Sequence, residues 1–100
     1  MKVKIDRPIG FIHHGAPYPI NYGYVEGVIG GDGEEQDCYV LGRDIVDPLA
    51  EFEGELIAII YRSDDVETKW VVSNEHYTAD EIRVEVNFME QYFDSRIEMI

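Results

Sequence analysis

The chain has 100 residues, a length that fits a single domain over residues 1–100, and its 45% of hydrophobic residues is too high for a disordered chain. Its 21 acidic and 8 basic residues give a formal net charge of -13 at pH 7, which opposes binding to nucleic acid or to an anionic membrane surface. No apolar run approaches the ~20 residues of a membrane span, and the lone Cys38 cannot form an internal disulfide, so we expect a cytoplasmic protein.

The first half of the chain predicts strands joined by turns. VKI at residues 3–5 is a short strand, and the segment 8–19, with three prolines and two glycines, is a loop. Alternation in NYGYVEGVI (21–29) predicts a half-buried strand. The acidic, glycine-rich turn GGDGEE (30–35) joins it to an apolar strand, DCYVLG (37–42), so the two form a β-hairpin with acidic residues at its tip.

The second half predicts another hairpin and one helix. GELIAIIYR (54–62) and TKWVVS (68–73) are strands that flank a second acidic turn. A capping box of Thr78 and Glu81 predicts a helix of roughly 15 residues, with an apolar face that consists of Ile82, Val86, Met89 and Phe93. The fold class is therefore α+β, with a small twisted or barrel-like antiparallel sheet of β-hairpins and one C-terminal helix.

The two acidic turns permit two interpretations. On local grounds each is an ordinary solvent-exposed turn, because Asp-Gly and acidic side chains are common there. Alternatively, the carboxylates bind a hard cation such as magnesium, with manganese as a second choice, since these ions prefer oxygen ligands. Arg7, Lys69 and the phenols of Tyr18 and Tyr22 then add groups suited to a small anionic phosphate substrate. The candidate metal ligands are Asp32, Glu34, Asp37, Asp64 and Glu67.

The stretch YPINYGYVEGVIGGDGEEQDCYVLG resembles the core of the soluble family I inorganic pyrophosphatases, in which a Tyr-Pro-x-Asn-Tyr-Gly segment precedes an acidic signature, D-G-D-P-x-D. The carboxylates of that signature match Asp32, Glu34 and Asp37. In the family an Asp, a second Asp and a Lys follow in a β-hairpin, where this chain has Asp64, Glu67 and Lys69. The resemblance extends to a phosphate-binding arginine, two active-site tyrosines and a tyrosine of the C-terminal helix, at Arg7, Tyr18, Tyr22 and Tyr92.

The resemblance implies magnesium-dependent hydrolysis of inorganic pyrophosphate to two phosphates by a metal-activated water. Asp32, Asp37 and Glu67 would share a pair of magnesium ions, and Asp64 would help to hold further metal. Glu34 is the candidate general base, with metal ligation as its alternative role. The substrate phosphates would be bound by Arg7, Lys69, Tyr18, Tyr22 and Tyr92, although aromatic packing is an alternative for Tyr22 and Tyr92.

The chain also departs from the family pattern. Glutamates replace aspartates at Glu34 and Glu67, Phe93 stands where a lysine is expected, and the chain begins too late to contain the family's N-terminal hairpin. Two other functions therefore stay open: hydrolysis of a larger phosphoanhydride or diphosphate ester, and a non-catalytic metal- or phosphate-binding module on the same fold. Assembly into a homo-oligomer is left open as well.

Four other reactive side chains are assigned structural or surface positions. His13 and His14 are adjacent, so their side chains diverge in a strand, and we expect loop histidines rather than metal ligands. His76 precedes the helix and is expected at the surface. Cys38 lies in an apolar strand without a paired histidine motif, which predicts a buried thiol rather than a nucleophile.

Overall fold

The structure, a computed structural model, describes residues 1–100 and contains nine strands and one helix. Seven strands form one sheet in the order β6-β1-β4-β5-β8-β7-β9, and β2 and β3 form a separate two-stranded ribbon. The elements are β1 (Lys2–Arg7), β2 (Ile12–His13), β3 (Ala16–Pro17), β4 (Asn21–Ile29), β5 (Glu35–Leu41), β6 (Glu51–Glu53), β7 (Glu55–Arg62), β8 (Thr68–Ser73), α1 (Ala79–Glu90) and β9 (Ser95–Met99).

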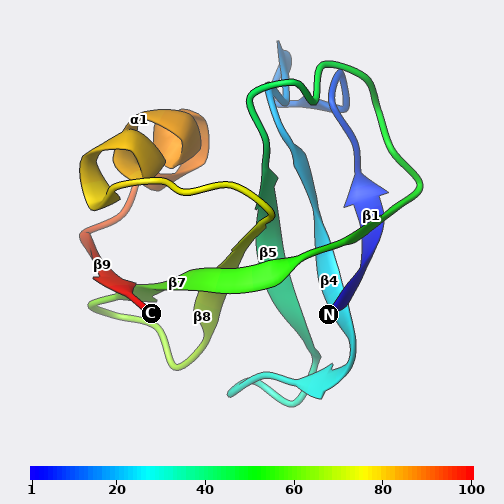
Figure 1. Ribbon diagram of the computed structural model, residues 1–100. Helices are drawn as coiled ribbons and strands as arrows, with labels where there is room; N and C mark the ends of the chain where they lie inside the picture. The colour runs from blue at the N-terminus through cyan, green and yellow to red at the C-terminus, as the bar shows by residue number, and fades with distance from the viewer.

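The sheet is strongly twisted and open. Figure 1 shows β7 running across the direction of β4 and β5, with the helix on one side of the sheet. Because β6 and β9 stand at the two ends of the strand order and do not pair with each other, the sheet does not close into a barrel. The α+β class with one helix near the C-terminus is confirmed, and of the two predicted sheet shapes the twisted one is observed.

The two predicted hairpins are present, and β4 and β8 have the predicted bounds. The prediction of a wholly antiparallel sheet is wrong for one pair, because β5 runs parallel to β8, with Cys38 opposite Trp70. The segment 8–19, predicted as a loop, contains the short strands β2 and β3. The last strand, β9, was not predicted either, because its polar and apolar residues alternate over only five positions after the helix.

Both faces of the central strands are buried, which explains their long apolar runs. Alternate residues of β5 point to opposite faces, so Tyr39 and Leu41 join the core under the helix, whereas Cys38 and Val40 join a second core on the other face. The prediction of a buried Cys38 thiol is confirmed, and burial raises its pKa. Any side chain of β5 on the same face as Tyr39 therefore points toward the side of the sheet that the helix partly covers.

The helix begins as predicted and ends earlier. The side chain of Thr78 accepts a hydrogen bond from the Glu81 backbone at 3.1 Å, and the Glu81 carboxylate accepts one from the Thr78 backbone at 2.8 Å, which completes the capping box. The helix ends at Glu90 after 12 residues, so Phe93 lies beyond it rather than on its apolar face. At this length and polarity α1 is not a membrane span, and the protein has no other helix.

Candidate active site

The parallel pairing of β5 with β8 places a carboxylate beside a buried lysine. Since Cys38 lies opposite Trp70, the preceding residues Asp37 and Lys69 are neighbours on the helix-side face. The Lys69 ammonium donates to Asp37 at 2.7 Å and to Glu67 at 2.6 Å. Only 6% of the lysine side chain is exposed, so Lys69 is a buried cation rather than a solvated strand residue.

The two acidic turns meet next to this lysine. Asp32, in the first turn, and Glu67, at the end of the second, share a hydrogen bond between their carboxyl groups, which raises the pKa of Glu67 and lowers the pKa of Asp32. Two like charges in contact repel each other unless a proton or a cation lies between them. Asp32 thus contacts Glu67, and Lys69 lies between Glu67 and Asp37, while the prediction that these three carboxylates share metal ions stays a prediction.

A glycine makes this approach of the turns feasible. A Cβ atom at Gly31 would lie 2.4 Å from the Val66 carbonyl oxygen, which is a backbone atom that cannot rotate away. Any side chain at position 31 must therefore push the two turns apart. The glycine-rich sequence of the first turn thus positions Asp32 against Glu67.

We expect Gly31→Ala to destabilise the fold by about 1–3 kcal/mol through this overlap. Gly30→Ala is the matched control, because the nearest atom to its Cβ is a Gln36 side-chain oxygen at 3.2 Å, and we expect a smaller effect there. Urea unfolding of both variants measures the difference. Equal stability of the two variants would show that the contact between Gly31 and Val66 does not constrain the turns.

A second group of predicted residues forms the opposite wall. Arg7 donates to the Tyr18 hydroxyl at 2.9 Å, and its guanidinium lies 5.9 Å from the centre of the Tyr22 ring. Arg7 makes no ion pair, whereas Lys69 makes two. Burial, with a contribution from Asp37, raises the pKa of Tyr22, so its phenol keeps its proton and can donate a hydrogen bond.

The structure adds a buried ion pair that the sequence reading missed. Arg62 donates to the two carboxylate oxygens of Glu90 at 3.1 and 2.7 Å, and the Tyr39 hydroxyl donates to the same carboxylate at 2.6 Å. The Arg62 and Glu90 side chains are 8% and 1% exposed. A signal was present in the sequence, because Glu90 follows Ile82 and Val86 at helical spacing on an otherwise apolar face.

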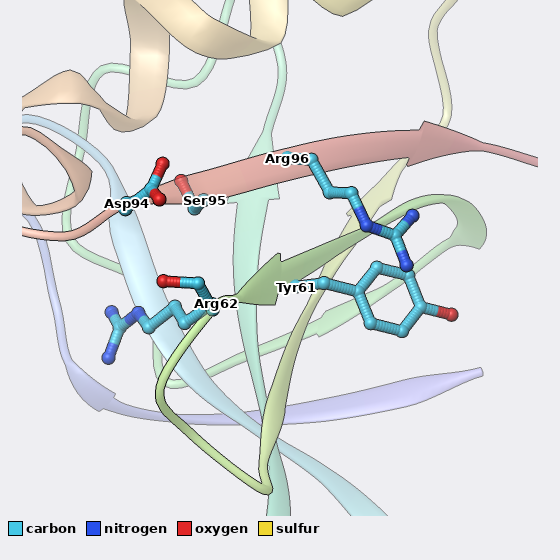
Figure 2. A pocket seen from close by; sticks show the side chains of 6 residues that line it. Tyr61, Arg62, Asp94, Ser95 and Arg96 are labelled. Carbon is cyan, nitrogen blue, oxygen red and sulfur yellow. The ribbon is translucent and has the colours of Figure 1, made fainter.

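Arg62 also lies beside Phe93, the position at which the sequence pattern led us to expect a lysine. Its guanidinium lies 3.7 Å from the centre of the Phe93 ring. In Figure 2, the side chains of Arg62 and Tyr61 leave the end of β7 in opposite directions. The guanidinium of Arg96 lies over the Tyr61 ring, on the side of β7 away from Arg62. The hollow of about 370 Å³ in that view lies between β7 and β9 and contains none of the predicted site residues.

The residues around Lys69 and Arg7 line a separate cavity of about 210 Å³ on the helix-side face. Three cations, Arg7, Arg62 and Lys69, line it beside the carboxylates of Asp6 and Asp37, and Arg7 is the one of the three that makes no ion pair. Such a cavity suits a compact anion. Its lining residues are Asp6, Arg7, Tyr18, Tyr22, Asp37, Arg62, Lys69, Met89 and Phe93.

Besides Asp32 and Glu67, three predicted residues do not line this cavity. Glu34 and Asp64 are exposed, and neither side chain makes a hydrogen bond or an ion pair within the protein. Tyr92 follows the end of the helix, is 73% exposed, and lines a neighbouring apolar cavity instead. The placement of Tyr92 on the helix is therefore wrong, and the predicted roles of Glu34 and Asp64 stay predictions.

The carboxylate oxygens of this region are of the kind that binds magnesium, but they are not arranged as a metal site. Carboxylate oxygens are the ligands that magnesium prefers, and the contact between Asp32 and Glu67 is one that a cation would relieve. No group of three or more His, Cys, Asp or Glu side chains is arranged to hold a metal ion. In this arrangement Lys69 provides the positive charge between Asp37 and Glu67.

Comparison with protein families gives one match, which spans nearly the whole chain. The model of the family described as inorganic pyrophosphatase matches residues 1–97. Among curated proteins, the inorganic pyrophosphatase of Aeropyrum pernix is 33% identical over 63 residues, which are 63% of this chain and 34% of that protein. The matched region thus spans about a third of that relative's length.

Solved structures share the fold over the full chain. The inorganic pyrophosphatase of Ehrlichia chaffeensis superimposes with a TM-score of 0.75 at 14% identity, covering 100% of this chain and 85% of that one. The enzyme of Helicobacter pylori superimposes with a TM-score of 0.67 at 13% identity, covering 100% and 81%. At these identities the likeness shows a common fold.

Proposed function

Because the chain belongs to the inorganic pyrophosphatase family, we propose that it hydrolyses inorganic pyrophosphate to two phosphates in a magnesium-dependent reaction. The observation that supports this most strongly is the Arg7 guanidinium, which faces the cavity without an acidic partner. A guanidinium binds phosphate oxygens through paired hydrogen bonds. Arg7 is therefore the cavity cation that would bind a substrate phosphate.

The residues that line the cavity then bind the phosphates and stabilise the charge that develops during the reaction. Arg7 and Lys69 bind the phosphate oxygens, and the phenol of Tyr22 donates a further hydrogen bond. Arg62 adds positive charge beside Phe93, because Arg62 lines the cavity whereas its partner Glu90 does not. Groups held in place before the reaction stabilise the charge that develops as the phosphoanhydride bond breaks.

Asp32, Asp37 and Glu67 are the residues that would hold magnesium. When bound, the ion supplies charge neutralisation at the phosphate oxygens and an activated water. Asp37 contacts both the lysine and the cavity, so it links the acidic turns to the anion site. Glu34 is the proposed proton acceptor for the attacking water, a role it could take only if its exposed side chain turned toward the cavity.

The test is phosphate release from pyrophosphate, with and without magnesium. We expect release that requires magnesium and stops on chelation. Magnesium at ten times its Kd should also stabilise the fold by about 1.4 kcal/mol, which for a chain of this size is a rise in Tm of about 6–11 °C. Potassium chloride at equal ionic strength is the control for simple charge screening.

The outcomes separate the candidate functions. A magnesium-dependent rise in Tm without phosphate release from any phosphoanhydride would identify a binding module. A rise in Tm that potassium chloride reproduces would show that the acidic turns are merely solvated. Release without magnesium would overturn the proposed metal dependence while leaving the anion site intact.

A further inference from the structure

A second cavity adjoins the cationic one. Its volume is about 510 Å³, and it lies between the β2–β3 ribbon and the C-terminal end of α1. Three residues, Tyr18, Met89 and Phe93, line both cavities. A molecule whose phosphates occupy the cationic cavity would therefore carry any further group into the second one.

The second cavity differs sharply in chemistry from the first. Six of its nine lining residues are hydrophobic, and no lysine, arginine or carboxylate is among them. Tyr92 and Phe93 are 73% and 39% exposed, so two aromatic side chains at this cavity are open to solvent. Its volume lies within the range of about 300–1,000 Å³ that is typical of small-molecule sites.

The polar groups of this cavity favour a heteroaromatic occupant over a purely aliphatic one. His13 and His14 lie among the lining residues, and partial burial, with smaller contributions from His14 and Arg7, lowers the pKa of His13. A neutral imidazole both donates and accepts hydrogen bonds. Aromatic rings with such groups around them suit a nucleobase, which stacks on aromatic side chains and has donors and acceptors at its edge.

We propose that this cavity binds the nucleoside part of a nucleoside diphosphate whose terminal phosphate occupies the cationic cavity. The inference rests on the proposed function and extends its substrate class. Water adds to the terminal phosphorus, the bond from that phosphorus to the bridging oxygen breaks, and the bridging oxygen leaves on the nucleoside monophosphate. One proton of the water is released, so the products are inorganic phosphate and the monophosphate.

The decisive variant fills the cavity without changing the cationic site. Ala16 is exposed and lines the apolar cavity but not the cationic one. Ala16→Trp should raise the KM for ADP at least about tenfold, since stacking of one base contributes roughly that factor or more. The KM for pyrophosphate should stay within about twofold, which also shows that the variant folds.

The matched control is Ala50→Trp, which makes the same change at an exposed alanine that lines neither cavity. We expect it to leave the KM for ADP and for pyrophosphate unchanged. An equal loss of ADP hydrolysis in both variants would overturn the proposal. So would an Ala16→Trp variant that is folded and hydrolyses ADP like the parent chain.

Binding of a non-hydrolysable analogue, α,β-methylene-ADP with magnesium, separates this proposal from the proposed function. In two-dimensional NMR, shifts at His13, His14 and Tyr92 that Ala16→Trp abolishes support the nucleoside site even if no substrate turns over. Absence of such shifts at millimolar analogue overturns it even if pyrophosphate is hydrolysed. Tighter binding of geranyl diphosphate than of the analogue would assign the cavity to an aliphatic group and overturn the nucleoside assignment.

Discussion

Glu90→Gln is expected to lower the free energy of unfolding by about 3–5 kcal/mol. The substitution removes the charge that compensates Arg62, and the guanidinium is buried too deeply to recover hydration without rearrangement. The Tyr39 hydroxyl loses a charged acceptor in the same step. Since domains of this size are stable by about 5–15 kcal/mol, the loss is a large share of the total.

The measurement is urea unfolding followed by circular dichroism, with Glu85→Gln as the matched control. Glu85 lies earlier on the same helix and makes no ion pair or side-chain hydrogen bond, so its replacement should cost little. The double variant Arg62→Met with Glu90→Leu should be clearly more stable than Glu90→Gln, because it leaves no buried charge. A Glu90→Gln variant as stable as the control would show that Arg62 does not depend on Glu90.

Asp37→Asn is expected to reduce phosphate release from pyrophosphate by at least about 100-fold. Asp37 is the one acidic side chain that both contacts Lys69 and lines the cationic cavity. Loss of its charge weakens the proposed magnesium site and leaves the lysine with Glu67 alone. Because 34% of the Asp37 side chain is exposed, the fold should survive the change.

The control is Asp44→Asn, which removes an exposed carboxylate that makes no contact with the cavity. Phosphate release and the magnesium-dependent rise in Tm should both match those of the parent chain. For Asp37→Asn, unchanged release would show that the acidic signature does not carry the chemistry. If Asp37→Asn no longer releases phosphate but still shows the parent's magnesium-dependent rise in Tm, Asp37 acts on the substrate rather than in metal binding.

Local patterns in the sequence determined the elements that depend on neighbouring residues. The strands β4 and β8 and the cap at Thr78 follow from alternation, turn residues and side-chain capping, all of which act within a few positions. The family resemblance also named Arg7, Asp37 and Lys69, which the structure brings to one cavity. Their approach to one another was not visible in the pattern itself.

Only the tertiary structure decided which distant segments meet. The parallel register of β5 and β8 sets Asp37 beside Lys69, and it depends on contacts between residues about 30 positions apart rather than on either strand's own sequence. The same holds for Glu90, a helical carboxylate that becomes a structural partner once β7 brings Arg62 to it. The cavity beyond Tyr18 likewise exists only because the β2–β3 ribbon folds back toward the end of α1. Periodicity records which face of an element is buried, whereas pairing between elements is settled by long-range packing and charge compensation.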